Sequence, residues 1–177
     1  MREADAEDAA GTPGAMDGPR EPAGPGARAG PGREASAGPA MQRVLVLCTH
    51  NSARSQMAEG FLRARAGDRL EVASAGTEAT RVHPLAVRAM DEVGIDLRAH
   101  ESKTVDGLSG QQWDWVITVC DSARERCPVF PGRTARLHWS FDDPSAAGGG
   151  EGEELAVFRR VRDEIAARIQ AWLASRP

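Results

Sequence analysis

The first 40 residues of this 177-residue chain contain no leucine, isoleucine, valine, phenylalanine or tryptophan. They consist mostly of glycine, proline, alanine, serine and charged residues, which cannot bury enough apolar surface to offset the entropy of ordering. We therefore expect residues 1–40 to be a disordered leader, and Met41 could equally be the initiator. Residues 41–177 have the length of one ordinary domain with a full hydrophobic core.

Long apolar runs are also missing. The leader lacks the continuous apolar segment of a secretory signal, and no later stretch approaches the ~18 apolar residues of a membrane span. The formal net charge is −4 and the arginines are scattered, so there is no electrostatic footprint for nucleic acid. These absences predict a cytoplasmic protein without a membrane or nucleic-acid partner.

Cysteine is scarce, with Cys48, Cys120 and Cys127 as the only examples. In a cytoplasmic chain, so few cysteines are more typical of reactive or metal-binding thiols than of a structural disulfide framework.

The apolar pattern alternates between strands and helices. It predicts strands at 43–48, 70–75, 115–119 and 135–139, helices at 55–63, 83–93, 104–112 and 154–175, and a loop at 146–152, with Gly76 closing the second strand. This alternation is typical of a single three-layer α/β domain, in which helices cover both faces of a parallel four-stranded sheet. Ligands bind such sheets at the carboxyl ends of the strands, where Cys48, Cys120 and Asp143 all fall.

Cys48 ends the first predicted strand, and Arg54 follows six positions later in a short polar loop. The N–H groups of such a loop converge at a helix N-terminus and favour an anion, to which Arg54 offers two parallel donors. The same positive field is expected to lower the pKa of Cys48 and make it a nucleophile. The alternative is that the spacing arose by chance and Cys48 is a small buried hydrophobe. The loop residues predicted to bind the anion are Thr49, His50, Asn51, Ser52, Ala53 and Ser55, of which Asn51 holds the loop and Ser55 donates to the thiolate.

Cys120 and Cys127 lie seven positions apart in a stretch of small and charged residues. A disulfide requires Cα atoms within about 7 Å, so the stretch would have to fold back to form one. A strained, exposed disulfide of that kind is readily reduced. A zinc site is one alternative, which the lack of a CxxC pair or a nearby histidine pair disfavours. Two unrelated buried cysteines are the other alternative.

Asp143 precedes Pro144 shortly after the last predicted strand. An aspartate held close to a bound oxyanion and partly desolvated suits a general acid that protonates a leaving oxygen. Asp-Pro is also an ordinary way to start a turn, which leaves a purely structural interpretation open.

Together these features resemble the arsenate reductases built on the low-molecular-weight tyrosine phosphatase fold, in particular the thioredoxin-coupled branch with three redox cysteines. The resemblance covers essentially all of residues 42–173. The matching residues are 46–60, 75–77, 84–87, 93–96, 118–120, 127–128 and 138–144.

The resemblance implies that Cys48 attacks arsenate, Arg54 binds its oxygens and Asp143 assists loss of hydroxide. It further implies a Cys48–Cys120 disulfide as arsenite leaves, then a Cys120–Cys127 disulfide that thioredoxin reduces. This chemistry detoxifies arsenic and requires no organic or metal cofactor. We expect a monomer, with glutaredoxin or mycothiol as alternative electron donors.

Two positions depart from the family pattern. His50 stands where some relatives have glycine, so a non-glycine residue must fit a tight anion loop. Lys103, the only lysine of the chain, stands where some relatives use an acidic residue to hold potassium. Its ammonium is predicted to replace that ion, and activity should then not distinguish potassium from sodium. A solvated surface lysine is the alternative.

The main rival function is a phosphatase acting on phosphotyrosine or a small phosphomonoester, because phosphate and arsenate are nearly isosteric. The chain has no tyrosine, and Ser145 stands where such phosphatases place an aromatic wall beside Asp-Pro. Ala53 replaces their second loop cysteine, and a hydrolase has no need of Cys120 and Cys127. A redox-sensing protein is a second rival, in which Asp143 would be dispensable.

Overall fold

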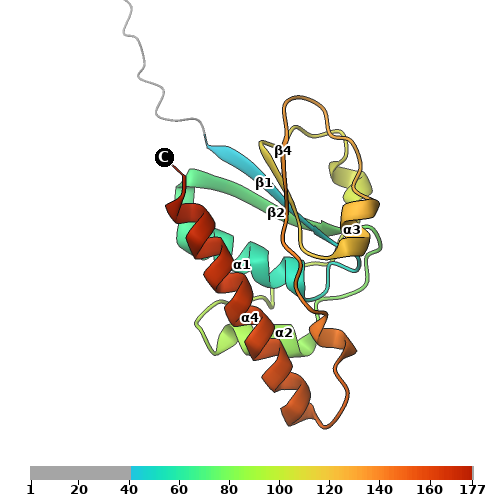
Figure 1. Cartoon of the computed structure of the whole chain (residues 1–177), viewed down its shortest axis with the longest axis vertical. Helices are drawn as coiled ribbons and strands as arrows, with labels where there is room; N and C mark the ends of the chain where they lie inside the picture. Colours follow the sequence, from blue (N-terminus) through green and yellow to red (C-terminus); the bar gives the residue numbers. More distant parts are fainter. Residues whose placement is uncertain (1–40, 177) are drawn as a thin grey trace, which may run out of the picture. The chain divides into compact units, whose positions relative to one another are not determined.

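The computed structural model describes residues 41–176, and the predicted leader of residues 1–40 lies outside them. A run of valine and leucine forms the central strand, because such residues suit a strand that is buried on both faces. Val44, Leu45, Val46 and Leu47 are at most 1% exposed. The four parallel strands lie in the order β2-β1-β3-β4, with bounds β1 (Gln42–Cys48), β2 (Leu70–Gly76), β3 (Trp115–Thr118) and β4 (Ala135–His138) (Figure 1).

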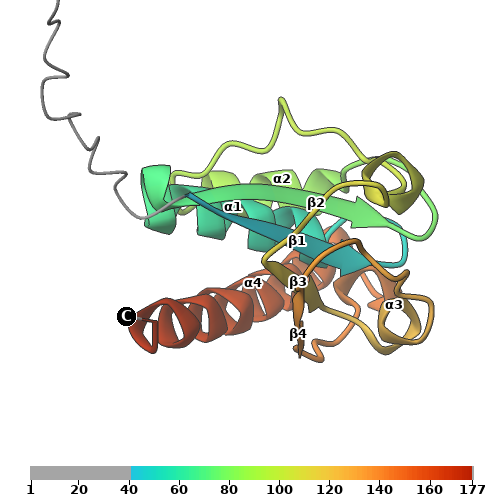
Figure 2. The same ribbon diagram turned by 90° about the horizontal axis from the view of Figure 1, so that it is seen from above.

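Four α-helices accompany the sheet, namely α1 (Arg54–Ala66), α2 (Pro84–Asp91), α3 (Asp121–Glu125) and α4 (Glu151–Ala174). Short 3-10 segments lie at Gly67–Arg69, Val105–Leu108 and Pro144–Ala146. Helix α1 packs against α4, β1 and β2, while α2 packs against α4 and α1 (Figure 2). Helix α3 contacts β1 and β3. The crossovers that contain α1 and α3 run in opposite directions across the sheet, so right-handed connections place these two helices on opposite faces.

The predicted α/β fold with a parallel four-stranded sheet is confirmed. The predicted helix at 104–112 is wrong in extent, since only Val105–Leu108 forms a 3-10 turn. The predicted loop at 146–152 ends early, because α4 begins at Glu151. There the Glu153 carboxylate accepts a hydrogen bond from the Gly150 N–H and caps the helix despite the glycines.

The segment between Cys120 and Cys127, predicted as a loop, contains the short helix α3. Cys120 is its N-cap residue, and Cys127 follows its end. The two cysteines are therefore separated by a helical turn in this state. Within residues 41–176, no helix has both the length and the apolar character to cross a membrane.

Candidate active site

Cys48 occupies the carboxyl end of β1, and the loop to α1 wraps around its sulfur. The side chain is 3% exposed. Its Sγ lies 2.9 Å from Ser55 Oγ and accepts a hydrogen bond of 3.0 Å from the Asn51 N–H. Both contacts come from the strand–loop–helix junction that the sequence predicted as the anion site.

The turn of this loop is made at Asn51, which has a φ of 47°. It is the only non-glycine residue in the described part of the chain with a positive φ. His50 therefore fits the tight loop without a positive φ, and Asn51 takes that conformation, which asparagine tolerates well. The His50 ring instead lies 3.8 Å from Glu78 and is half exposed.

Two further residues brace the loop from behind. Gln56 Nε2 donates to Asn51 O and Asn51 Oδ1, each at 3.0 Å, and is completely buried. Gly76 lies so close that an added Cβ would come within 2.5 Å of Thr49 O and 2.8 Å of Asn51 N. Sequence reasoning missed the role of Gln56, because a glutamine in the first turn of a helix gives no local sign that it is buried, and only the packing shows it.

The loop retains donors for an anion. The backbone N–H groups of His50, Ser52 and Ala53 donate to no acceptor among the described residues. The loop carbonyls are used, since Thr49 O accepts from the Glu78 N–H and Ser52 O from the His83 N–H. N–H groups that converge at the start of a helix, with the carbonyls tied back, form a cradle for an oxyanion.

The thiol of Cys48 does not have the lowered pKa predicted from the sequence. Burial raises its pKa, and the neighbouring Cys120 raises it further. Hydrogen bonds from the Ser55 hydroxyl and from the Asn51 and Ser55 backbone lower it, but burial is the largest influence. The prediction considered only the local dipole and guanidinium, and it omitted the cost of removing a thiolate from water.

Arg54 and Asp143 meet at the site although they are distant in sequence. Arg54 Nη2 lies 3.0 Å from Asp143 Oδ2, and Nη1 donates to Phe141 O at 3.1 Å. Asp143 Oδ1 also accepts from the Ser145 N–H at 3.1 Å, so the residue starts a turn as well. An arriving oxyanion has to share the Arg54 guanidinium with this carboxylate.

Cys120 faces the anion loop. Its Sγ lies 3.3 Å from Thr49 Oγ1, and the side chain is 5% exposed. The middle cysteine therefore lies beside the anion loop, although it is buried within the hydrophobic core cluster of the domain.

Cys127 lies farther out, at a cavity of about 370 Å³ between α3, β3 and β4. It is half-buried, and burial raises the pKa of its thiol while Arg136 lowers it. All three cysteines are free thiols. Among the described residues, no cluster of three or more His, Cys, Asp or Glu side chains is placed to hold a metal ion. The residues lining this cavity are Val116, Thr118, Arg124, Cys127, Arg136, Leu137 and His138.

Lys103 contacts the loop through its backbone. Its N–H donates to Asn51 Oδ1 at 2.9 Å, and its carbonyl accepts from the Gly76 N–H at 2.9 Å. Within residues 41–176, its ammonium forms no ion pair. The buried carboxylate nearest to this network, Glu59, is instead paired with Arg63. The structure thus gives no sign of the predicted ion-like position for the Lys103 side chain.

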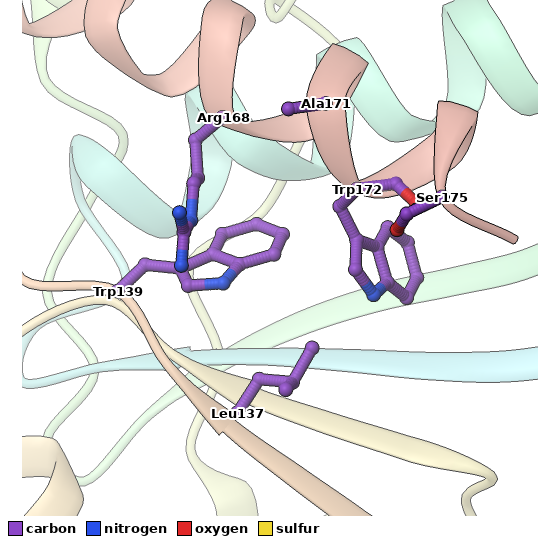
Figure 3. Close-up of a pocket in the computed structure, with 6 residues that line it drawn as sticks. All are labelled: Leu137, Trp139, Arg168, Ala171, Trp172 and Ser175. Atoms are coloured by element: carbon purple, nitrogen blue, oxygen red, sulfur yellow. The ribbon is translucent and has the colours of Figure 1, made fainter.

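A second cavity, of about 210 Å³, lies between β4 and the C-terminal part of α4. Figure 3 shows the indoles of Trp139 and Trp172 facing this space, with the Arg168 guanidinium beside Trp139. None of the predicted site residues lines it. Its lining residues are Leu137, Trp139, Arg168, Ala171, Trp172 and Ser175.

A cysteine in an anion loop at the end of a central parallel strand, opposed by an arginine and an Asp-Pro aspartate, defines a class of enzymes that attack tetrahedral oxyanions. The chain belongs to the low molecular weight phosphotyrosine protein phosphatase family, whose model matches residues 43–176.

The relatives that the chain matches include arsenate reductases. The chain is 50% identical over 129 residues to an arsenate reductase of Halalkalibacterium halodurans, covering 73% of this chain and 93% of the relative. It is 47% identical to an arsenate reductase of Bacillus subtilis over the same shares of the two chains. A solved arsenate reductase in the phosphate binding state is 34% identical, with a TM-score of 0.62, covering 76% of this chain and 98% of that one.

Proposed function

We propose that this protein reduces arsenate to arsenite and thereby detoxifies arsenic. The observation that carries the proposal is the placement of Cys120 at the mouth of the Cys48 loop, 3.3 Å from the Thr49 hydroxyl. A second thiol at that position has a use in a reductase and none in a hydrolase. A relative that is 50% identical in sequence and is named arsenate reductase supports the same function.

In the proposed first step, the Cys48 thiolate attacks arsenic in the loop while Arg54 and the N–H groups hold the oxygens. Asp143 transfers the proton released by the Cys48 thiol to a hydroxyl of arsenate, which leaves as water and gives a covalent sulfur–arsenic adduct. Because burial raises the pKa of Cys48, the thiol needs help to ionise, and hydrogen bonds from Ser55 and Asn51 provide part of it.

In the second step, the Cys120 thiolate attacks Cys48 Sγ, and the sulfur–arsenic electron pair stays on arsenic. Two thiols are oxidised to a disulfide, and arsenic(V) is reduced to arsenic(III). Cys127 then attacks Cys120, which frees Cys48 and moves the disulfide outward. This exchange requires α3 to unwind, since that helix separates Cys120 from Cys127.

The proposed reductant of the outer disulfide is thioredoxin or a related dithiol protein, and no organic or metal cofactor takes part. Cys127 is followed by Pro128 and by Val129, whose side chain is 86% exposed. An exposed apolar residue beside a half-buried thiol suits a protein reductant that must contact the sulfur directly. We propose that the enzyme acts as a monomer.

The test couples the purified protein to thioredoxin, thioredoxin reductase and NADPH, and then adds arsenate. We expect arsenate-dependent NADPH consumption that disappears in each of Cys48→Ser, Cys120→Ser and Cys127→Ser. Omitting thioredoxin is the control for direct reduction. Consumption that persists without Cys120 would overturn the relay.

The family also contains phosphatases, so hydrolysis of phosphotyrosine or small phosphomonoesters is the second candidate. The double variant Cys120→Ser/Cys127→Ser separates the two functions, because it retains Cys48, Arg54 and Asp143. Efficient turnover of a phosphotyrosine peptide by this variant, with no arsenate reduction by the intact protein, would identify a phosphatase.

A further inference from the structure

The cavity beside Cys127 has the size and the chemistry of a small-molecule site that the proposed reaction does not use. Its volume of about 370 Å³ lies within the ~300–1,000 Å³ that is typical of ligand pockets. Val116 and Thr118 of β3 line it and are 0% and 5% exposed, and Leu137 of β4 is half-buried. The cavity therefore has a partly apolar wall against which the methylene groups of a ligand can pack.

Two arginines line the same cavity without a carboxylate partner. These are Arg124 of α3 and Arg136 of β4, and neither forms an ion pair with another residue of the described range 41–176. Arg136 Nη2 donates to Pro128 O at 2.8 Å, which orients the guanidinium and leaves its charge unpaired.

The third basic residue of the lining, His138, is already engaged. Its Nε2 lies 2.9 Å from Asp121 Oδ1, and its Nδ1 lies 2.8 Å from Thr118 Oγ1. The Asp121 carboxylate, which does not line the cavity, also accepts from the Ser140 hydroxyl at 3.4 Å. The two arginines are therefore the lining charges that remain for a ligand. They favour carboxylate groups, which a guanidinium binds through two parallel hydrogen bonds.

Cys127 adds a reactive group to this lining. The residue is half-buried, and the hydrogen-bond partner of its sulfur among the described residues is the Pro128 carbonyl at 3.7 Å. Burial raises the pKa of the thiol while Arg136 lowers it, so the guanidinium acts on the sulfur as well as on the cavity. A thiol next to a cation suits exchange with disulfides, because the thiolate is the attacking species.

We propose that this cavity binds low-molecular-weight disulfides that carry carboxylate groups, through Arg124 and Arg136, and that Cys127 forms a mixed disulfide with them. The Cys127 thiolate attacks one sulfur of the small disulfide, whose S–S bond breaks as the new S–S bond forms. The other half leaves as a thiolate with the electron pair and takes up a proton from solvent. Cys127 is thereby oxidised, and half of the small disulfide is reduced.

This inference goes beyond the proposed function, since the exchange involves neither arsenate nor Cys48. In the proposed relay it has a direct consequence. A Cys127 that is held in a mixed disulfide cannot attack Cys120, so turnover stops until a reductant removes the small thiol.

The test measures mixed-disulfide formation in the full chain with Cys48→Ser and Cys120→Ser, so that Cys127 is the sole thiol. The probes are 3,3′-dithiodipropionate, which carries two carboxylates, and 2-hydroxyethyl disulfide, which is neutral. Mass spectrometry of timed samples gives the rate with each probe over a range of concentrations. We expect the rate with dithiodipropionate to level off as its concentration rises, which indicates binding before exchange, and the rate with the neutral probe to rise linearly.

The decisive quantity is the ratio of the two rates at low probe concentration. Arg124→Gln/Arg136→Gln should lower this ratio roughly 5- to 20-fold and make the dithiodipropionate rate linear in concentration. Because the ratio compares two probes at one thiol, it does not respond to the change in the Cys127 pKa that follows the loss of Arg136. Arg133→Gln is the matched control, since it removes an exposed arginine of the same segment that does not line the cavity.

Three results would overturn the proposal. These are a linear dithiodipropionate rate in the protein with both arginines, a ratio that the double variant leaves unchanged, and an equal fall of the ratio in Arg133→Gln. The single variants Arg124→Gln and Arg136→Gln serve the same test if circular dichroism shows that the double variant is unfolded. Because the assay contains neither arsenate nor thioredoxin, its failure would leave the proposed function standing, and a failure of arsenate reduction would leave this inference standing.

Discussion

Asn51 makes hydrogen bonds to Cys48, Ser55, Ser74 and Gln56, whereas the only hydrogen-bond partner of the Cys127 sulfur among the described residues is the Pro128 carbonyl at 3.7 Å. The Cys48 loop is buried, and every buried side-chain polar atom in the described part of the chain has a partner. The segment from Cys120 to Cys127 contains the five-residue helix α3, in which the side chains of three residues are exposed.

The difference matches what each region has to do in the proposed reaction. A nucleophile that binds an oxyanion gains from fixed geometry, because catalysis depends on pre-positioned donors. Thiols that exchange a disulfide have to approach one another, so their segment needs a low cost of local unfolding. The same domain therefore combines a buried site that has many hydrogen bonds with an exposed segment that has few.

The largest expected effect is a difference in arsenite formation between variants of Cys48 and Cys127, the first and last thiols of the proposed relay. Cys48→Ser should form no arsenite, a loss of more than about a thousandfold. Cys127→Ser should form about one equivalent of arsenite per enzyme and then stop, because the Cys48–Cys120 disulfide cannot be passed on. Rapid quenching with quantification of arsenite distinguishes the two. Sustained turnover by Cys127→Ser would show that the reductant reaches the inner disulfide directly.

A substitution at Gly76 tests whether the Cys48 loop needs its fixed geometry. Gly76→Ala places a Cβ against Thr49 O and Asn51 N, so the loop has to shift. We expect a loss of about 1–3 kcal/mol in the free energy of unfolding and roughly 10- to 100-fold slower turnover. Gly107→Ala, where an added Cβ meets nothing within 4 Å, is the matched control. Urea denaturation and the coupled assay provide the measurements, and equal effects of the two variants would contradict a rigid loop.

The reactivity of the thiols sharpens the comparison between the two regions. The half-buried Cys127 should be alkylated before the buried Cys48 and Cys120. Because burial raises the pKa of Cys48, its alkylation rate should continue to rise as the pH passes the ordinary thiol value of ~8.5. Phosphate in the loop should protect Cys48 and leave Cys127 reactive. Mass spectrometry of timed samples checks the order, and a Cys48 that reacts first at neutral pH would contradict it.

The smallest expected effect concerns His83, whose N–H holds the Ser52 carbonyl of the loop. Its Nδ1 accepts from the Leu85 N–H at 3.2 Å and caps α2, which requires a neutral ring. Burial lowers the pKa of His83, so its contribution to stability is present above the ordinary histidine pKa of ~6.5 and is lost as the pH falls below it. His83→Asn keeps a capping group that does not titrate. Thermal unfolding from pH 7.5 to 5 should therefore be less pH-dependent in the variant, and an unchanged slope would exclude this role.

Local pattern was sufficient for much of the fold. The apolar run of β1, the β3 strand and the amphipathic face of α4 were predicted within a few residues, because each is a periodic feature of neighbouring positions. Element ends were less accurate where a single contact decides them, as with the Glu153 cap that starts α4 at Glu151. The helix α3 was missed because its five residues carry no periodic apolar signal.

The sequence predicted which residues make up the candidate site, but it did not predict their burial, their ion pairs or the direction of the Cys48 pKa shift. The spacing of Cys48 and Arg54 indicated an anion loop, and the strand order brought Cys120 and Asp143 to it. The direction of the Cys48 pKa shift was predicted wrongly, since it depends on burial by residues from several elements. The ion pair of Arg63 with Glu59 was also missed, although the two residues are four positions apart on α1, a spacing that favours such pairs.

The sequence by itself determined which segments form the central strands, where the polar loop follows Cys48, and which three thiols the chain has, because these depend on short-range pattern and residue type. Only the tertiary structure decided that Asn51 takes the left-handed turn, that Arg54 pairs with Asp143, and that the Cys48 thiol is buried. Those outcomes depend on burial and on contacts between segments that are far apart in the chain. Such burial and contacts arise only when the sheet and helices have packed.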